Sequence, residues 1–228
     1  MTRPIPPTLV AHLTEWLGKW PTGAGGITVV GSQARTVPGW DLVTHDVVGV
    51  VTPDRGVLSV PPEAFDAVAA LCRGEDVASD LAAISVPGAL AGAVGRAGRV
   101  GLGVFRWSDS PTSTPDAGEW VPTDDSRVPE WLRPFNGDVL VAWDDDGRYG
   151  GGVGRKCHDL YGHELSVGTE PSLRGRGIAR QLVATAARRV LADGAIPTYL
   201  HAHTNTASAR VAVAAGFPDE GWQVVGLW

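Results

Sequence analysis

The second half of the chain has a pattern of hydrophobic and polar positions that predicts a mixed sheet flanked by helices. Apolar residues recur at every fourth position from Ile178 to Val190, the spacing of an amphipathic helix that packs one face against a core. Strands are expected before and after this helix, and such a strand–helix–strand unit implies a parallel pair with a right-handed crossover. The expected strands cover residues 138–143, 148–158, 164–169, 196–203 and 223–228.

The first 135 residues show a weaker pattern of the same kind. Their expected strands cover residues 27–30, 45–51, 57–60 and 99–107, and their expected helices cover residues 8–20 and 62–72, with a further short helix from Asp80. The chain is therefore expected to be an α/β protein of two regions, residues 1–135 and 136–228. The first region is either an α/β extension or a degenerate copy of the second.

Composition narrows the class of protein. Hydrophobic residues make up 43% of the chain, enough for a substantial core, and the net charge of −6 comes without a basic run, which disfavours a nucleic-acid partner. No apolar run approaches the length of a membrane span, and the N-terminus lacks the apolar core of a signal peptide. The 2 cysteines make no disulfide framework. A cytoplasmic protein without membrane or nucleic-acid partners is expected, and the sequence leaves open whether it forms a homodimer.

Candidate chemistry begins at the turn from Arg174 to Ala179, which stands between an expected strand and the helix that follows it. A glycine-bearing turn at the start of a helix gathers backbone N–H groups at the positive end of the helix dipole. Such a turn binds phosphate or diphosphate without a lysine. Gly175 and Gly177 let the backbone approach a ligand, and Ala179 is small enough for the helix to start close to the sheet. The turn is therefore predicted to hold a phosphate group.

The spacing of these residues does not fit two common phosphate-binding motifs. The P-loop pattern GxxxxGK[ST] is absent, and the dinucleotide fingerprint GxGxxG is only half present, because Arg180 stands where its third small residue belongs. An acidic residue about twenty positions further on is also missing. What remains is the pattern R-x-x-G-x-A of Arg174, Gly177 and Ala179. This pattern resembles the acyl-CoA pyrophosphate motif of the GNAT superfamily of N-acetyltransferases.

A second motif further along the chain strengthens the resemblance. Asn205 and Ser208 follow the next expected strand in the pattern N-x-x-S, and an expected helix leads from them to Gly216 and Phe217. GNAT proteins have a similar Asn motif, helix and Gly-Phe pair in this order and at this separation. Asn205 is also a good helix N-cap and Gly216 a good residue after a helix, so both have a structural explanation without a ligand. The order of the elements as a whole is specific, and the resemblance covers residues 138–228.

The resemblance implies a GNAT-like acyltransferase fold, acetyl-CoA as co-substrate, and direct transfer of an acetyl group in a ternary complex to a primary amine of a small molecule or a peptide. In that family the strand before the phosphate-binding turn separates from its parallel neighbour, and the pantetheine arm of the coenzyme lies in the gap. No metal is implied. The first 135 residues would form an acceptor-site or cap domain, with Trp107, Trp120 and Trp131 near the boundary. By position, the implied coenzyme A contacts are Leu165, Ser166, Val167, Arg174, Gly175, Arg176, Gly177, Ile178, Ala179, Asn205 and Ser208.

Two residues are expected to carry the chemistry that the resemblance implies. The backbone N–H near Val167 would polarise the thioester carbonyl, as an oxyanion-hole donor does. A primary amine has a pKa of about 10.4 and must lose a proton before it attacks, and Glu164 is the first candidate for the base. Because side chains alternate along a strand, Glu164 can face the pocket, but it can equally be a surface carboxylate in an ion pair. His158 and His163 are secondary candidates.

Two alternatives remain open. Many GNAT enzymes have a tyrosine that protonates the leaving thiolate where this chain has Ala212, with Tyr199 and Ser208 as conceivable substitutes. A protein without that acid could be a non-catalytic sensor, which binds acyl-CoA and does not transfer the acyl group. A zinc site built from Cys157 and the histidines is disfavoured, because the chain lacks the usual spacings of zinc ligands.

Overall fold

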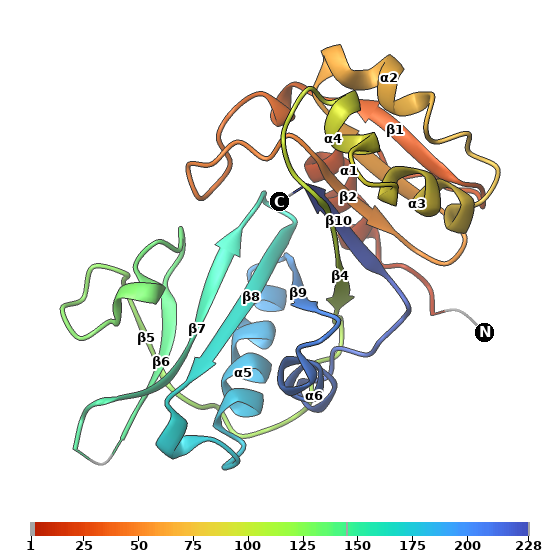
Figure 1. Cartoon of the computed structure of the whole chain (residues 1–228). Helices are drawn as coiled ribbons and strands as arrows, with labels where there is room; N and C mark the ends of the chain where they lie inside the picture. The colour runs from red at the N-terminus through yellow and green to blue at the C-terminus, as the bar shows by residue number, and fades with distance from the viewer. Residues whose placement is uncertain (1–2, 145, 228) are drawn as a thin grey trace. The chain divides into compact units, whose positions relative to one another are not determined.

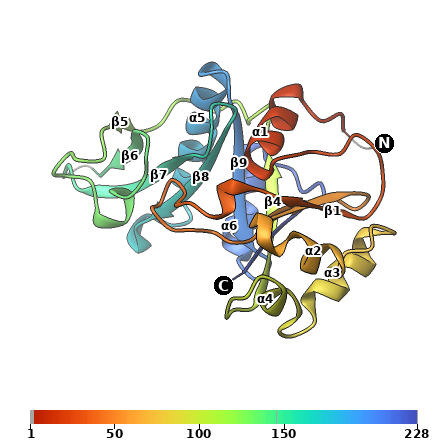
Figure 2. The ribbon, with the colours of Figure 1, turned by 90° about the horizontal axis from the view of Figure 1, so that it is seen from above.

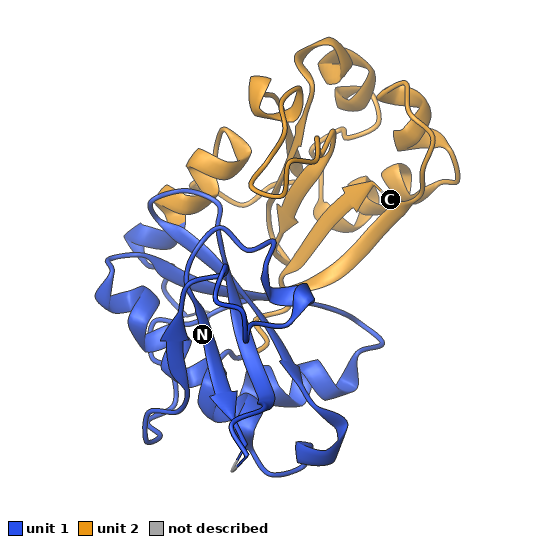
Figure 3. Cartoon of the chain, turned by 90° about the vertical axis from the view of Figure 1, so that its left-hand side faces the viewer, with its two compact units in different colours: residues 1–9, 106–218 blue, residues 10–105, 219–228 orange. Residues whose placement is uncertain are grey.

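The computed structural model describes residues 3–144 and 146–227, and the chain divides into two compact units (Figure 3). Unit 1 contains residues 1–9 and 106–218, and unit 2 contains residues 10–105 and 219–228. Each unit therefore combines segments that are far apart in the sequence. A division of labour at residue 135, with a cap domain before it and a coenzyme A-binding domain after it, stays a prediction.

Unit 1 is built on a mixed sheet with the strand order β9-β8-β7-β6-β5 (Figure 1). Its neighbouring strands are antiparallel except for β8 and β9, which are parallel. The strands are β5 (Glu119–Val121), β6 (Val139–Trp143), β7 (Tyr149–Cys157), β8 (Gly162–Thr169) and β9 (Ile196–Ala202). Short 3-10 turns at Glu130–Leu132 and Pro171–Leu173 precede β6 and follow β8.

Two helices cover one face of this sheet. α5 (Ile178–Ala192) connects β8 to β9, and α6 (Thr206–Ala215) follows β9. Leu182, Ala186 and Val190 of the apolar stripe of α5 are fully buried together with strand residues such as Val153 and Leu165, and Ile178 packs against them partly buried. Burying one leucine or valine side chain stabilises the fold by about 1.5–3 kcal/mol, so this stripe holds the helix on the sheet. The helix that the four-residue spacing predicts is confirmed.

Unit 2 has its own mixed sheet with the strand order β1-β3-β2-β10-β4. β1 and β3 are parallel, and the other neighbours are antiparallel. The strands are β1 (Ile27–Gly31), β2 (Val48–Val51), β3 (Gly56–Val60), β4 (Val100–Trp107, of which residues 100–105 belong to this unit) and β10 (Gln223–Leu227). The sheet thus brings the last strand of the chain in between β2 and β4.

Helices lie on both sides of these strands. Figure 2 shows α2 (Phe65–Ala69), α3 (Val77–Ser85) and α4 (Ala89–Ala93) on one side and α1 (Pro7–Leu17, of which residues 10–17 belong to this unit) on the other. The core under the three short helices contains residues of β1, β3 and β10 together with Val68, Ile84 and Leu90. Further 3-10 turns cover Gln33–Arg35 and Pro62–Ala64.

Most of the expected elements are present within a few residues of their expected bounds. The expected helix over residues 62–72 starts as a 3-10 turn at Pro62 and ends at Ala69. α4 and the three-residue strand β5 were not expected from the sequence. The last expected strand is confirmed as far as Leu227, and Trp228 lies outside the described residues.

Candidate functional site

The sheet of unit 1 opens between its two parallel strands. β8 and β9 pair only from Gly162 opposite Ile196 to Glu164 opposite Thr198. β8 continues to Thr169, still paired with β7 on its other edge, and β9 continues to Ala202. The strands therefore separate after Glu164, as the resemblance implied.

The backbone of β8 turns Val167 toward this opening. Tyr161 O accepts a hydrogen bond from Ile196 N at 2.7 Å, on the side of β9, whereas Gly162 O accepts one from His158 N at 3.3 Å, on the side of β7. Because backbone groups alternate in direction along a strand, Leu165 and Val167 direct their N–H and C=O groups toward β9. Val167 lies beyond the last pair, so its N–H points into the gap.

Ser166 is oriented differently from its neighbours. It pairs with Gly154 of β7, so its backbone groups point away from the gap, and only its side chain remains for a ligand. Leu165 and Val167 pack their side chains against the core under α5. Glu164, Ser166 and Gly168 must therefore face the opposite side of the sheet.

The turn before α5, residues 174–177, is exposed to solvent. Gly175 and Gly177 have φ angles of 78° and 80°, in the left-handed region that favours glycine, and a Cβ at either position would meet no atom within 4 Å. Within the described parts of the chain, no side chain caps the first amides of α5. Arg174 and Arg176 are exposed beside them, and Arg174 Nε donates to Thr169 O at 3.2 Å. Uncapped amides, a helix dipole and flanking arginines fit a diphosphate.

Glu164 is a buried carboxylate whose two oxygens are both engaged. Its Oε1 accepts a hydrogen bond from Lys156 Nζ of β7, and its Oε2 lies 3.2 Å from His158 Nε2. Burial raises the pKa of Glu164, but the hydrogen bond with His158 and the charge of Lys156 outweigh burial, so the pKa lies below its usual value. Glu164 is therefore ionised and is no solvated surface carboxylate.

Sequence reasoning did not find Lys156 as the partner of Glu164. The two residues are directly opposite in the antiparallel ladder of β7 and β8. Opposite residues of adjacent strands point to the same face, so a lysine and a glutamate in this register can form an ion pair. The ion pair could be predicted from the sequence only if the register of β7 and β8, with Cys157 opposite His163, was already known.

The residues expected at the start of α6 form a small hydrogen-bonded group. Asn205 caps the helix by accepting a hydrogen bond from Ser208 N at 3.0 Å. Ser208 Oγ lies 2.8 Å from the hydroxyl of Tyr199, which is buried on β9, and burial raises the pKa of that phenol. Ala212, four residues after Ser208 and on the same side of α6, is fully buried. Ser208 and Tyr199 therefore supply a pair of hydrogen-bonded hydroxyls one turn before Ala212.

The other candidates from the sequence lie in different surroundings. His163 falls on the face of β8 opposite to Glu164, and His201 accepts a hydrogen bond from Arg106 Nε at 3.0 Å. Among residues 3–144 and 146–227, no three His, Cys, Asp or Glu side chains gather as metal ligands would. Trp107 is buried, and the guanidinium groups of Arg155 and Arg189 lie 5.6 and 6.0 Å from the ring centroid of Trp120. No helix in the described ranges combines the length and apolar character needed to cross a membrane.

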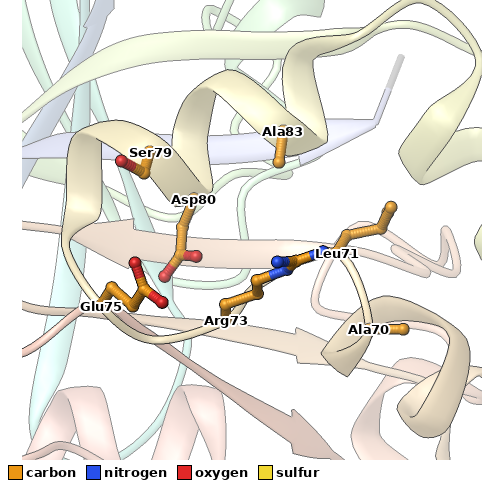
Figure 4. A pocket seen from close by; sticks show the side chains of 7 residues that line it. All are labelled: Ala70, Leu71, Arg73, Glu75, Ser79, Asp80 and Ala83. Atoms are coloured by element: carbon orange, nitrogen blue, oxygen red, sulfur yellow. The ribbon is translucent and has the colours of Figure 1, made fainter.

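Unit 2 contains a pocket of about 380 Å³ with none of the expected site residues (Figure 4). Its buried carboxylate, Asp80, accepts hydrogen bonds from Ile27 N at 2.7 Å and from Gly74 N at 3.2 Å. These bonds tie β1 to the loop before α3, which is a structural role. The pocket is lined by Ala70, Leu71, Arg73, Glu75, Ser79, Asp80 and Ala83.

Comparison with solved structures finds similar folds in part of the chain. A GNAT-family protein from Novosphingobium aromaticivorans is 24% identical, with a TM-score of 0.48, over 57% of this chain and 64% of its own. An acetyltransferase of the GNAT family from Colwellia psychrerythraea is 14% identical, with a TM-score of 0.43, over 56% of each chain. A GCN5-related N-acetyltransferase-like protein from Streptococcus suis is 16% identical, with a TM-score of 0.42, over 57% of this chain and 62% of its own. The chain therefore spans less than two thirds of each of these structures.

No curated protein matches the chain. The model of the Acetyltransferase (GNAT) family matches residues 103–217, half of the chain. This range contains the opening between β8 and β9, the glycine turn before α5, and the Asn205 cap of α6. The chain belongs to the GNAT family of acetyltransferases.

Proposed function

We propose that the protein is an N-acetyltransferase that moves an acetyl group from acetyl-CoA to a primary amine in a ternary complex. The observation that carries this proposal is the position of the opening in the sheet, next to the uncapped start of α5. A long ligand with a diphosphate near its middle and an acyl thioester at one end fits such an arrangement. The turn would hold the diphosphate, and the gap beyond Glu164 would hold the arm that carries the thioester.

Each group of the chain has a defined task in this reaction. The N–H of Val167 would donate to the thioester oxygen as negative charge develops on it. Glu164, directly or through a water, would accept a proton from the incoming ammonium group. The amine nitrogen bonds to the acetyl carbon while the carbon–sulfur bond breaks, and the electron pair leaves with the sulfur. Of the two protons that the ammonium group loses, one ends on the sulfur and one goes to solvent through the base.

Ala212 favours a second candidate function, a sensor that binds acyl-CoA and does not transfer the acyl group. This side chain has no hydroxyl and is fully buried, so residue 212 cannot protonate a thiolate. The two functions differ in one measurement, the release of free thiol from acetyl-CoA in the presence of a panel of amines. Thiol release that depends on the amine supports the transferase, and binding of acetyl-CoA without thiol release supports the sensor.

Gly177→Glu should weaken the binding of coenzyme A by at least about tenfold. The new carboxylate would stand among the amides that are expected to hold the diphosphate, and like charges repel. Isothermal titration calorimetry with coenzyme A gives the dissociation constant directly.

The matched control is Gly194→Glu, at the other end of the same helix. Gly194 also has a positive φ, 85°, and open space around a Cβ, so the control carries the same backbone strain and the same charge. Its affinity for coenzyme A should equal that of the unaltered protein. If all three proteins bind coenzyme A with equal affinity, the diphosphate does not bind at this turn.

A further inference from the structure

The acceptor has only one side of the sheet from which to approach the opening. α5 packs against β8 on the face that carries the side chains of Leu165 and Val167. The opposite face carries Glu164, Ser166 and Gly168, and in the described part of unit 1 no α-helix packs on it, only the 3-10 turn Glu130–Leu132 and the residues after it (Figure 1). A substrate amine that attacks a thioester lying in the gap must therefore come from this second face.

This second face carries three glycines, Gly152, Gly154 and Gly168. The segment of residues 131–135 lies directly on their backbone. A Cβ at Gly168 would stand 2.8 Å from Cζ2 of Trp131, and a Cβ at Gly152 would stand 2.8 Å from Cδ1 of Leu132. Gly154 is in the same way covered by the ring of Phe135. No larger residue fits at these three positions without displacing the segment, so the glycines allow this close approach.

Trp131 is held in one orientation on this face. The hydroxyl of Tyr149 lies beside the indole and donates to Gly168 O at 3.3 Å, under the same ring. Its ring also meets that of Phe135 edge to face, with centroids 6.1 Å apart and an interplanar angle of 86°. Burial raises the pKa of Tyr149 to about 12, so the phenol keeps the proton that it donates.

Although it is fixed in this way, Trp131 remains 38% exposed. An indole that is both immobile and accessible loses little conformational entropy when an apolar group packs on it. Trp107 and Trp120, the other tryptophans that the sequence suggested for the acceptor site, lack this combination. Trp107 is 1% exposed, and Trp120 packs against the core under α5.

We propose that Trp131 is the specificity-determining residue of the acceptor site, and that the acceptor is a primary amine joined through a short linker to a flat apolar group. The inference rests on the proposed function. Gly168, under the indole, directly follows Val167, whose N–H faces the gap. Consecutive residues of a strand are about 3.3 Å apart, so a linker of about two carbons spans the distance from the reacting carbon to the indole.

The test compares two amines that differ only in the apolar group, 2-phenylethylamine and ethylamine. The protein should use 2-phenylethylamine with a kcat/KM about tenfold or more above that for ethylamine. Trp131→Ala should reduce this ratio to about threefold or less, with the KM for acetyl-CoA unchanged. Trp131→Phe, which retains a flat ring, should keep most of the preference.

Trp143→Ala is the matched control. Trp143 is a partly exposed tryptophan of the same sheet, on β6, and its indole N–H donates to Glu119 at 2.8 Å. Its replacement should leave the ratio between the two amines as it is. Melting temperatures of all variants show whether a loss of rate reflects a loss of folded protein.

A binding measurement separates this inference from the proposed function. Calorimetric titration of 2-phenylethylamine into protein saturated with coenzyme A should show binding that Trp131→Ala weakens about tenfold. If acetyl-CoA is turned over but Trp131→Ala leaves both the ratio and the affinity unchanged, the inference is wrong and the acetyltransferase stands. If no amine releases thiol, the proposed function is wrong, and the titration alone decides whether Trp131 binds the amine. A preference for cadaverine, an amine without a flat apolar group, over 2-phenylethylamine would show that the proposed class of acceptor is wrong.

Discussion

Val167→Pro should lower kcat by about 100- to 1000-fold, the effect of losing one oxyanion-hole donor. Proline has no N–H, so the substitution removes the hydrogen-bond donor that faces the gap. The loss to the sheet is small, because the pair of Val153 and Val167 lies between the hydrogen-bonded pairs of β7 and β8, and Val167 N–H does not bond to β7. Single-turnover kinetics with saturating acetyl-CoA measure the chemical step, and calorimetry shows whether coenzyme A still binds.

Thr169→Pro is the control for this substitution. Thr169 lies two residues further along β8, directs its N–H to the same side, and is not among the expected site residues. The same ring is introduced into the same strand, but the N–H of Val167 is kept, so kcat should fall by less than about tenfold. A similar loss in both variants would mean that proline distorts β8, and an unchanged kcat in Val167→Pro would assign the donor role to another group.

Glu164→Gln should lower the free energy of unfolding by about 3–5 kcal/mol at neutral pH, the usual effect of removing one partner of a buried ion pair. The substitution removes the negative charge of the buried carboxylate, with which Lys156 Nζ forms an ion pair. Because the pKa of Glu164 is lowered in the folded protein, its ionised form contributes stability above the ordinary pKa of 4.5, and this contribution is lost as the pH falls through the lowered value. The difference between the two proteins should therefore shrink on acidification, as urea unfolding at several pH values would show.

Glu15→Gln, which neutralises an exposed carboxylate of α1, is the control and should change stability by no more than about 0.5 kcal/mol. The catalytic role of Glu164 has a separate readout. If Glu164 is the base, the rate of Glu164→Gln should fall most near neutral pH and approach the original rate toward pH ~10, where the amine is already deprotonated. If the ratio of the rates of Glu164→Gln and the unaltered protein is constant across the pH range, Glu164 is not the base, and its role is limited to the ion pair.

Periodic apolar residues and short motifs carried the prediction of the second half of the chain. α5 could be predicted because its stripe is continuous, and its start because glycines precede it. α4 could not, because its sequence of alanine, leucine and glycine has low helix propensity at Gly92, and packing of Leu90 in the core compensates for this. The interpretation of Glu164 depended on Lys156, which becomes its partner only through the register of two strands. The contact of Trp131 with Gly168 joins residues that are far apart in the sequence, so no local pattern predicts it.

Each unit combines two segments that are far apart in the sequence, so the protein cannot be divided into its units by one cut in the chain. β10, at the end of the chain, pairs with β2 and with residues 100–104 of β4, all of which belong to unit 2. A fragment cut out after residue 135 would keep β10 but leave both of its edges without partners, which invites aggregation. A fragment of unit 1 is better sought by starting it at Arg106 and ending it after Pro218, which leaves β10 out. A fragment of unit 2 needs β10 joined to residues 10–105, as a circular permutation would do.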